Sequence, residues 1–155
     1  MLYLVRHAKA GSRSEFVGDD KLRPLSPPGR RQADAIGKRL VEAGVQHFIS
    51  SSSLRCIQTL RPAAKSVGAK IETDDRLYEG RPADPVLDLL ASVPDATALC
   101  SHGDVIPDTM DALVRRGCEI LSVPDWRKGS VWVLQRSPTG EIVSAEAWPP
   151  PDSAK

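Results

Sequence analysis

The sequence predicts an α/β fold: a three-layer α/β/α sandwich with a mostly parallel central sheet and a C-terminal hairpin. Short apolar segments alternate with longer segments of helical periodicity along most of the chain, a pattern typical of parallel strands joined by helices. Only the last two apolar segments, at residues 130–135 and 142–147, are joined directly by a short turn sequence, Ser137 to Gly140, which predicts a hairpin. At 155 residues the chain has the usual size of one domain.

The predicted elements follow from the spacing of apolar residues and from helix start and stop signals. Ser26, which precedes Pro27, and Ser53 are each expected to begin a helix with a capping hydroxyl. The strands before the hairpin are expected at residues 2–5, 47–51, 70–73 and 97–101. The helices are expected to cover residues 26–42, 53–68, 84–90 and 103–117.

Two segments are expected to lie outside this regular structure. Residues 8–24 are polar and contain glycine, so we expect a long loop of the kind that often serves function. We expect residues 1–148 to form the domain, and residues 149–155, which begin with three prolines, to form an extended and frayed tail.

The composition excludes several classes of protein. Basic and acidic residues almost balance, and the net charge is +1, so no general field favours nucleic acid or an anionic membrane as a partner. The three cysteines, Cys56, Cys100 and Cys118, are far apart in the sequence and predict neither a disulfide framework nor a zinc site. Cys56 and Cys100 are expected to act as small apolar fillers. Because no apolar run has the length of a signal-peptide core or a membrane span, we expect a cytoplasmic protein.

Side chains that suit phosphate follow three of the expected strands. Arg6 and His7 end the first strand, Ser51 leads from the second toward Arg55, and His102 follows the fourth. Because the carboxyl ends of parallel strands meet at one edge of a sheet, where ligands bind in such folds, we expect these side chains to lie together. The planar guanidinium groups can each donate two parallel hydrogen bonds to phosphate oxygens.

Four motifs, in this order, resemble the histidine phosphatase superfamily, also called the phosphoglycerate mutase-like family. LVRHA at residues 4–8 is similar to its R-H-G signature, with Ala8 in the place of the glycine, as in many SixA-like members. Residues 20–33 resemble its R-P-L-[ST]-x-x-G-x-x-Q-A stretch, residues 51–59 its S-S-x-L-x-R-x-x-Q-T segment, and residues 101–105 its second S/T-H-G motif. The short chain resembles the SixA-like branch, and residues 18–24 and 128–133 are similar to phosphatase domains associated with Nudix hydrolases.

The resemblance implies a phosphatase in which His7 attacks phosphorus and carries the phosphoryl group, with Arg6, Arg55 and His102 around the phosphate. The chemistry of these side chains agrees with that role. The positive charge of two arginines disfavours protonation of His7 and leaves it a lone pair for attack. A covalent phosphohistidine then divides one difficult step into two easier ones.

Other side chains are expected to complete the site. Glu79 lies at the family's L-x-E position and is expected to be the general acid, with Asp104 as the alternative. No cofactor or metal is expected, because the acidic residues that recur on the helix after His102 have too few histidines near them. The residues expected to contribute to substrate binding are Lys9, Ser12, Lys21, Arg23, Gly103 and Asp104.

The expected activity is hydrolysis of a phosphate ester or phosphoramidate, and its substrate stays open. A protein phosphohistidine is favoured by the absence of a long inserted helical lid in so short a chain. A phosphorylated small molecule, including a nucleoside diphosphate or triphosphate, is favoured by the basic loop and by the Nudix-associated resemblance. A noncatalytic protein that binds phosphorylated ligands is the alternative of another class, but the intact Arg6, His7, Arg55 and His102 argue against it.

Overall fold

The central sheet of the protein combines parallel strands with one reversed strand. The computed structural model describes residues 1–151, and its strands form one sheet in the order β3-β2-β4-β1-β6-β7-β5. Strands β1 to β4 pair in parallel, with Val5 opposite Cys100 and Ile49 opposite Leu99. Strand β6 is antiparallel to both β1 and β7. The strands are β1 (Leu2–Arg6), β2 (His47–Ser50), β3 (Ile71–Thr73), β4 (Thr97–Ser101), β5 (Glu119–Ile120), β6 (Val131–Arg136) and β7 (Ile142–Trp148).

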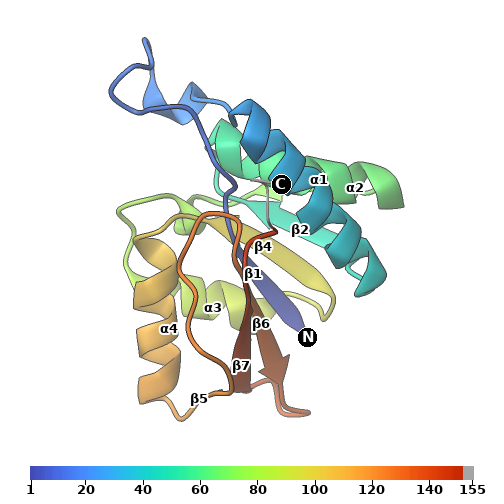
Figure 1. Ribbon diagram of the computed structural model, residues 1–155. Coiled ribbons are helices and arrows are strands. Elements are labelled where there is room, and N and C mark those ends of the chain that lie inside the picture. The colour runs from blue at the N-terminus through green and yellow to red at the C-terminus, as the bar shows by residue number, and fades with distance from the viewer. Residues whose placement is uncertain (152–155) are drawn as a thin grey trace.

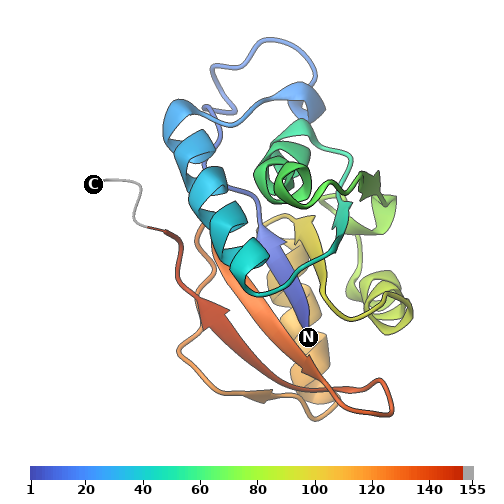
Figure 2. The same cartoon turned by 90° about the vertical axis from the view of Figure 1, so that its right-hand side faces the viewer.

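Helices cover both faces of the sheet. Helices α1 and α2 lie on one face and α3 and α4 on the other (Figures 1 and 2). Successive side chains of a strand point to opposite faces, so Leu2 and Leu4 pack with α3 and α4 while Tyr3 and Val5 pack with α1 and α2. The structure thus confirms the three-layer prediction. The helices are α1 (Pro27–Glu42), α2 (Leu54–Val67), α3 (Ala83–Ser92) and α4 (Val105–Arg115), with short 3-10 turns η1 (Asp20–Leu22) and η2 (Asp75–Leu77).

The two predicted serine caps behave differently. The Ser26 hydroxyl accepts a hydrogen bond from the Gly29 amide, as expected. Ser53 stands at the N-cap of α2, but its hydroxyl makes no capping bond. The capping prediction is wrong there, because the Cys56 amide donates to the backbone carbonyl of Ser53 instead.

The C-terminal part of the sheet differs from expectation in two details. Strand β5 was not predicted, because a pair of residues is too short to show periodicity. Trp148 ends β7 and is held in place, since the Arg39 guanidinium lies 3.9 Å from its ring centroid and the Tyr3 ring lies 5.6 Å away. Residues 152–155 of the expected tail lie outside the described residues.

The loop at residues 8–24 projects above α1 and α2 and carries η1 (Figures 1 and 2). An isolated antiparallel bridge between Ala10 and Leu25 closes its base. Within residues 1–151, no helix has both the length and the apolar character that a membrane span requires.

Candidate active site

A cavity of about 620 Å³ lies where β1 and β4 end. Arg6, His7, Arg55 and His102, which the sequence predicts to lie together, all line it. The ring centroids of His7 and His102 are 5.5 Å apart. This position agrees with the rule that ligands of α/β sheets bind beyond the carboxyl ends of the strands.

The His7 ring is held with one nitrogen free. Its Nδ1 lies 2.8 Å from the backbone carbonyl of Ala8, and the side chain is buried. Because a carbonyl oxygen can only accept, Nδ1 carries the proton and Nε2 keeps the lone pair. Burial lowers the pKa of His7 well below its ordinary value of 6.5; the Ala8 hydrogen bond opposes this shift, whereas His102, Arg55 and Arg6 add to it.

The depressed pKa of His7 predicts how activity and stability depend on pH. A neutral nucleophile persists below pH 6.5, so kcat/KM for p-nitrophenyl phosphate, corrected for ionisation of the substrate, should keep its plateau below that pH. His7 is protonated near pH 6.5 in the unfolded chain, whereas the native state keeps it neutral to a lower pH. The free energy of unfolding therefore has its full contribution from His7 above pH 6.5 and loses it as the pH falls toward the native pKa. Denaturant unfolding at several pH values should show a smaller acid-induced loss in His7→Ala. A fall in the corrected kcat/KM that already begins at or above pH 6.5 would contradict this prediction.

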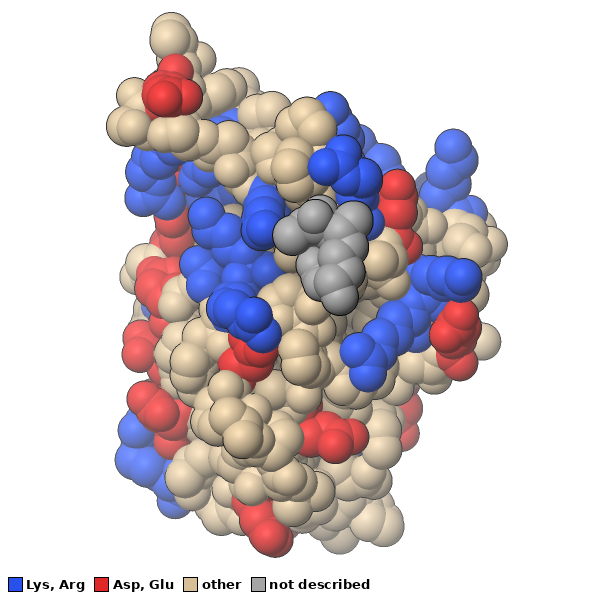
Figure 3. Space-filling view, in the orientation of Figure 1, with Lys and Arg blue, Asp and Glu red and all other residues tan. Residues whose placement is uncertain are grey.

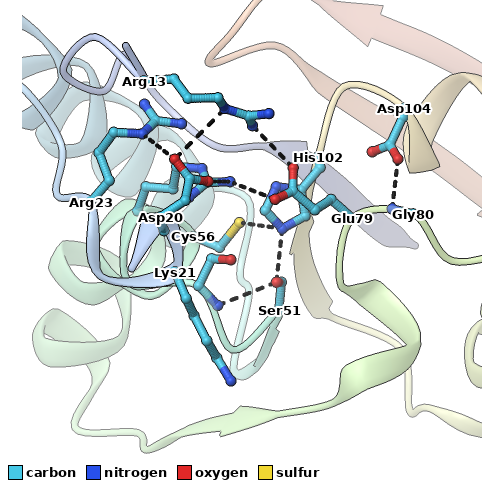
Figure 4. A network of polar contacts seen from close by, with 12 residues as sticks. Arg13, Asp20, Lys21, Arg23, Ser51, Cys56, Glu79, Gly80, His102 and Asp104 are labelled. Atoms are coloured by element: carbon cyan, nitrogen blue, oxygen red, sulfur yellow. Dashed lines mark hydrogen bonds and ion pairs between the residues drawn. The ribbon is translucent and has the colours of Figure 1, made fainter. Parts of the chain in front are cut away.

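His102 is oriented by neighbours from α2 and the segment before it. Its Nε2 lies 2.8 Å from the Ser51 hydroxyl and 3.6 Å from the Cys56 thiol. The Ser51 oxygen also accepts from the Ser53 amide at 3.3 Å, and a neutral His102 ring carries its proton on Nδ1 when the Ser51 hydroxyl donates to Nε2. Cys56 is buried, as expected of a filler, but it also contacts this histidine (Figure 4).

Arg6 lies flat against the backbone of Gly103. A Cβ atom at Gly103 would lie 2.6 Å from Cζ and Nη2 of Arg6, so only glycine allows this approach. The Arg6 Nη1 donates to the carbonyl of Trp126, and its Nε is buried without a partner in the described part of the chain. Burial lowers the pKa of Arg6 somewhat, and the charge of Asp104 opposes that shift.

Replacing Gly103 with alanine should displace Arg6 rather than unfold the protein. The clashing group is the end of a flexible side chain, so the melting temperature should change little. A displacement of about 1 Å near the reacting group can cost on the order of 10²-fold, and we expect a loss of that size in kcat/KM. Gly103→Ala, Arg6→Met and the double variant form the test. Losses that multiply in the double variant would show that the alanine does not act through Arg6.

Arg55 lies at the centre of a network of charges. It is almost fully buried, and its Nη1 donates to the Asp20 carbonyl at 3.0 Å. Its Nη2 lies 3.4 Å from Asp20 Oδ2 and 3.5 Å from Glu79 Oε1. Its Nε, like that of Arg6, is buried and unpaired among residues 1–151. The network therefore fixes one edge of the guanidinium group and leaves the Nε donor free.

Asp20 ties the loop to this network. Its Oδ1 accepts from Arg23 Nε at 2.9 Å and lies 3.6 Å from Arg13 Nε (Figure 4). Burial alone would raise the pKa of Asp20, but the Arg23 hydrogen bond and the charges of Arg55, Arg23 and Arg13 together lower it. Asp20 thus holds the loop at residues 8–24 over Arg55.

The two candidate acids have different environments. Glu79 lines the cavity, with Oε2 3.1 Å from Arg13 Nη2 and Oε1 near Arg55. Asp104 also lines the cavity, but its Oδ2 accepts from the Gly80 amide at 2.7 Å (Figure 4). Asp104 therefore anchors the segment that carries Glu79, and both side chains meet positive or donor groups.

Of the other residues predicted to bind substrate, some line the cavity and others do not. Ser12, Arg23, Gly103 and Asp104 line the cavity, although Arg23 is largely occupied by Asp20 and the Gly11 carbonyl. Contrary to expectation, Lys9 and Lys21 do not line it. The side chain of Lys9 is exposed, whereas its amide is held by Gln32. Lys21 extends away from the carboxylates (Figure 4), with its Nζ 5.7 Å from the centroid of the Tyr78 ring.

Comparison with known proteins identifies the family. Residues 2–84, more than half of the chain, match the model of the histidine phosphatase superfamily (branch 1). The chain belongs to this superfamily. A structure of a Nakamurella multipartita protein assigned as the phosphohistidine phosphatase SixA is 31% identical, with a TM-score of 0.75, and the match covers 96% of this chain and 95% of that one. The chain is therefore a histidine phosphatase domain of the SixA-like type.

Two further comparisons extend this assignment. The structure of SixA complexed with tungstate is 17% identical, with a TM-score of 0.76 and coverage of 99% of both chains, and it shows the same fold. The 8-oxo-(d)GTP phosphatase of Mycolicibacterium smegmatis is 35% identical over an alignment of 155 positions, which covers 96% of this chain and 48% of that protein. The chain thus spans about half the length of this curated relative.

Sequence reasoning missed two residues of this histidine phosphatase site, Lys128 and Asp20. Lys128 lines the cavity together with Arg13, one of the basic residues of the loop, and Asp20 joins three arginines beside it. Asp20 lies within a matched motif, so the motif could have indicated it. Lys128 is brought in by the segment before β6, far from the other site residues in sequence. Among residues 1–151, no group of three or more His, Cys, Asp or Glu side chains is arranged to hold a metal ion.

Proposed function

We propose that the protein is a phosphatase that hydrolyses phosphate esters or phosphoramidates through a phosphohistidine on His7. One observation carries the proposal: three buried side-chain nitrogens around the cavity, Arg6 Nε, Arg55 Nε and His102 Nδ1, have no partner among the described residues. Buried donors in native structures are normally paired. A tetrahedral anion beside His7 would supply acceptors for all three.

In the proposed reaction, Nε2 of His7 attacks phosphorus, and the bond from phosphorus to the leaving group breaks. Arg6, Arg55 and His102 donate to the nonbridging oxygens, where charge is redistributed in the transition state. Water then attacks the phosphohistidine, the P–N bond breaks, and orthophosphate leaves with neutral His7 restored. The arginines provide the positive charge that metal ions provide in many other phosphoryl-transfer sites.

We assign Glu79 as the proton donor to basic leaving groups and Asp104 as the residue that positions it. In the free protein Glu79 is paired with Arg13 and Arg55. A bound phosphate competes with Glu79 for Arg55 and places negative charge beside that carboxylate. The same group can then activate the water that hydrolyses the intermediate.

The substrate is a phosphorylated small molecule or a protein phosphohistidine. The SixA-type structure that is 31% identical supports the phosphohistidine, because a phosphohistidine phosphatase is what that protein is assigned as. The 8-oxo-(d)GTP phosphatase supports a nucleotide as the substrate.

The domain boundary proposed from the sequence, residue 148, falls at the end of β7.

Turnover of p-nitrophenyl phosphate in the presence of excess EDTA tests the proposal. We expect hydrolysis that EDTA does not reduce and that vanadate inhibits competitively, because vanadate adopts the geometry expected of the transition state. Activity that EDTA removes and a divalent cation restores would contradict the proposed mechanism. Binding of vanadate without turnover of any phosphate ester would indicate a phospho-ligand binding protein instead.

A further inference from the structure

The cavity holds more positive charge than one reacting phosphate requires. Its lining includes Arg6, Arg13, Arg23, Arg55 and Lys128 against two carboxylates. Lys and Arg side chains also gather beneath the loop at residues 8–24 on the face drawn in Figure 3. The volume of about 620 Å³ lies in the range of sites that hold a complete small molecule. Charge and size together indicate a substrate with more than one anionic group.

The cations divide into an inner and an outer group. Arg6 and Arg55 are the inner group, with buried Nε donors next to His7 and His102. Arg13 and Lys128 are the outer group and both have exposed side chains. Arg13 uses Nη2 for Glu79, and no hydrogen bond from its Nη1 or from Lys128 Nζ is formed within residues 1–151. The outer group can therefore contact a second anion while the inner group holds the first.

The position of Lys128 is built into the fold. The Gly129 amide donates to the backbone carbonyls of both Arg6 and His7, and Gln32 Nε2 donates to the carbonyl of Lys128 at 3.3 Å. Gly129 adopts a φ of +87°, which glycine tolerates and other residues rarely adopt. These bonds fix Lys128 next to the end of β1. Burial and the charges of Arg6, Arg23, Arg55 and Arg13 lower the pKa of Lys128, in agreement with that position.

A phosphate leaving group needs less help from a proton donor than an alcohol does. Glu79 faces two guanidinium groups, and Asp104 accepts from the Gly80 amide. A phosphate group ionises near neutral pH and leaves as an anion, whereas an alcohol must be protonated. The outer cations would stabilise the charge that develops on a departing phosphate.

We propose that Arg13 and Lys128 form a second anion site, which binds the inner phosphate of a nucleoside diphosphate or triphosphate or a similar diphosphate ester. This inference rests on the proposed function and names its substrate class. His7 Nε2 attacks the terminal phosphorus, the bond from that phosphorus to the bridging oxygen breaks, and the shortened phosphate ester leaves with the electron pair. Water then cleaves the P–N bond and releases one orthophosphate.

Binding of two phosphonates that the enzyme cannot cleave tests the second site without any need for activity. By calorimetry, methylenediphosphonate should bind the wild-type chain about tenfold more tightly than methylphosphonate, since charged donors contact its second group. Lys128→Ala should remove most of this tenfold difference, because it should weaken binding of methylenediphosphonate more than binding of methylphosphonate. Lys38→Ala, an exposed lysine on α1, is the matched control and should change neither. Equal affinity of wild type for both probes, or equal weakening of both by Lys128→Ala, would overturn the proposal.

Turnover separates this inference from the proposed function. We expect ADP to yield AMP and one orthophosphate, and Lys128→Ala to lower kcat/KM for ADP about tenfold more than kcat/KM for p-nitrophenyl phosphate. If ADP is not a substrate although p-nitrophenyl phosphate is hydrolysed, the second site is refuted and the phosphatase stands. If neither is hydrolysed, the proposed function fails, whatever the binding results. A preference for a phosphohistidine protein over ADP would also refute the second site.

Discussion

His7→Ala should reduce phosphatase turnover by about 10⁴-fold or more, because removing the nucleophile of a covalent mechanism leaves only binding and charge stabilisation. The ring is buried and fixed through Nδ1 by the Ala8 carbonyl, and alanine leaves no nitrogen at the position of Nε2. The variant should still bind phosphate or vanadate through Arg6, Arg55 and His102. Steady-state kinetics and calorimetry with vanadate would measure the two properties.

His47→Ala is the matched control for this experiment. His47 is exposed at the start of β2 and lies outside the cavity. We expect wild-type activity from this variant. Residual activity above about one tenth of wild type in His7→Ala would show that another group attacks phosphorus.

Arg55→Met should lower kcat by about 10³-fold, the second largest effect expected. Arg55 brings a buried charge and an unpaired Nε to the reacting phosphate, and arginines that stabilise phosphoryl transfer contribute on this scale or above. Methionine retains the packing volume but none of the donors. KM should rise as well, because the ground-state phosphate loses the same contacts.

The controls for Arg55→Met separate activity from folding. Loss of the Arg55 guanidinium group leaves Asp20 and Glu79 with fewer partners, so we expect the free energy of unfolding to fall by about 1–3 kcal/mol. Arg61→Met, an exposed arginine on the same helix, should leave both activity and stability unchanged. Arg55→Lys keeps the charge without the planar fork, and full activity in that variant would show that geometry at this position is unimportant.

The sequence predicted the inner part of the site because topology determines it. Arg6 ends β1, and His7 and His102 directly follow β1 and β4. These strands are parallel neighbours, so residues nearly a hundred positions apart arrive at the same edge. Helix boundaries were also predictable where the signal is local. Ser26 with Pro27 begins α1, and Gly68, at a φ of +70°, ends α2.

The outer part of the site could not be predicted because no local rule determines how a loop folds. The positions of Arg13 and Asp20 depend on ion pairs among side chains that approach one another only after the loop closes. Lys128 reaches the cavity through hydrogen bonds of Gly129 to Arg6 and His7, and these contacts leave no periodic trace in the sequence. The same reasoning explains why the expected contributions of Lys9 and Lys21 did not appear in the cavity.

Trapping the phosphorylated enzyme tests the central claim most directly. The wild-type chain would be mixed with ³²P-labelled substrate, denatured in alkali within milliseconds, digested and sequenced by mass spectrometry. The account predicts a label that is stable in alkali and labile in acid, located on His7 and absent from the His7→Ala variant. A label on His102 or on a carboxylate, or rapid turnover by wild type with no labelled protein at any time point, would contradict it.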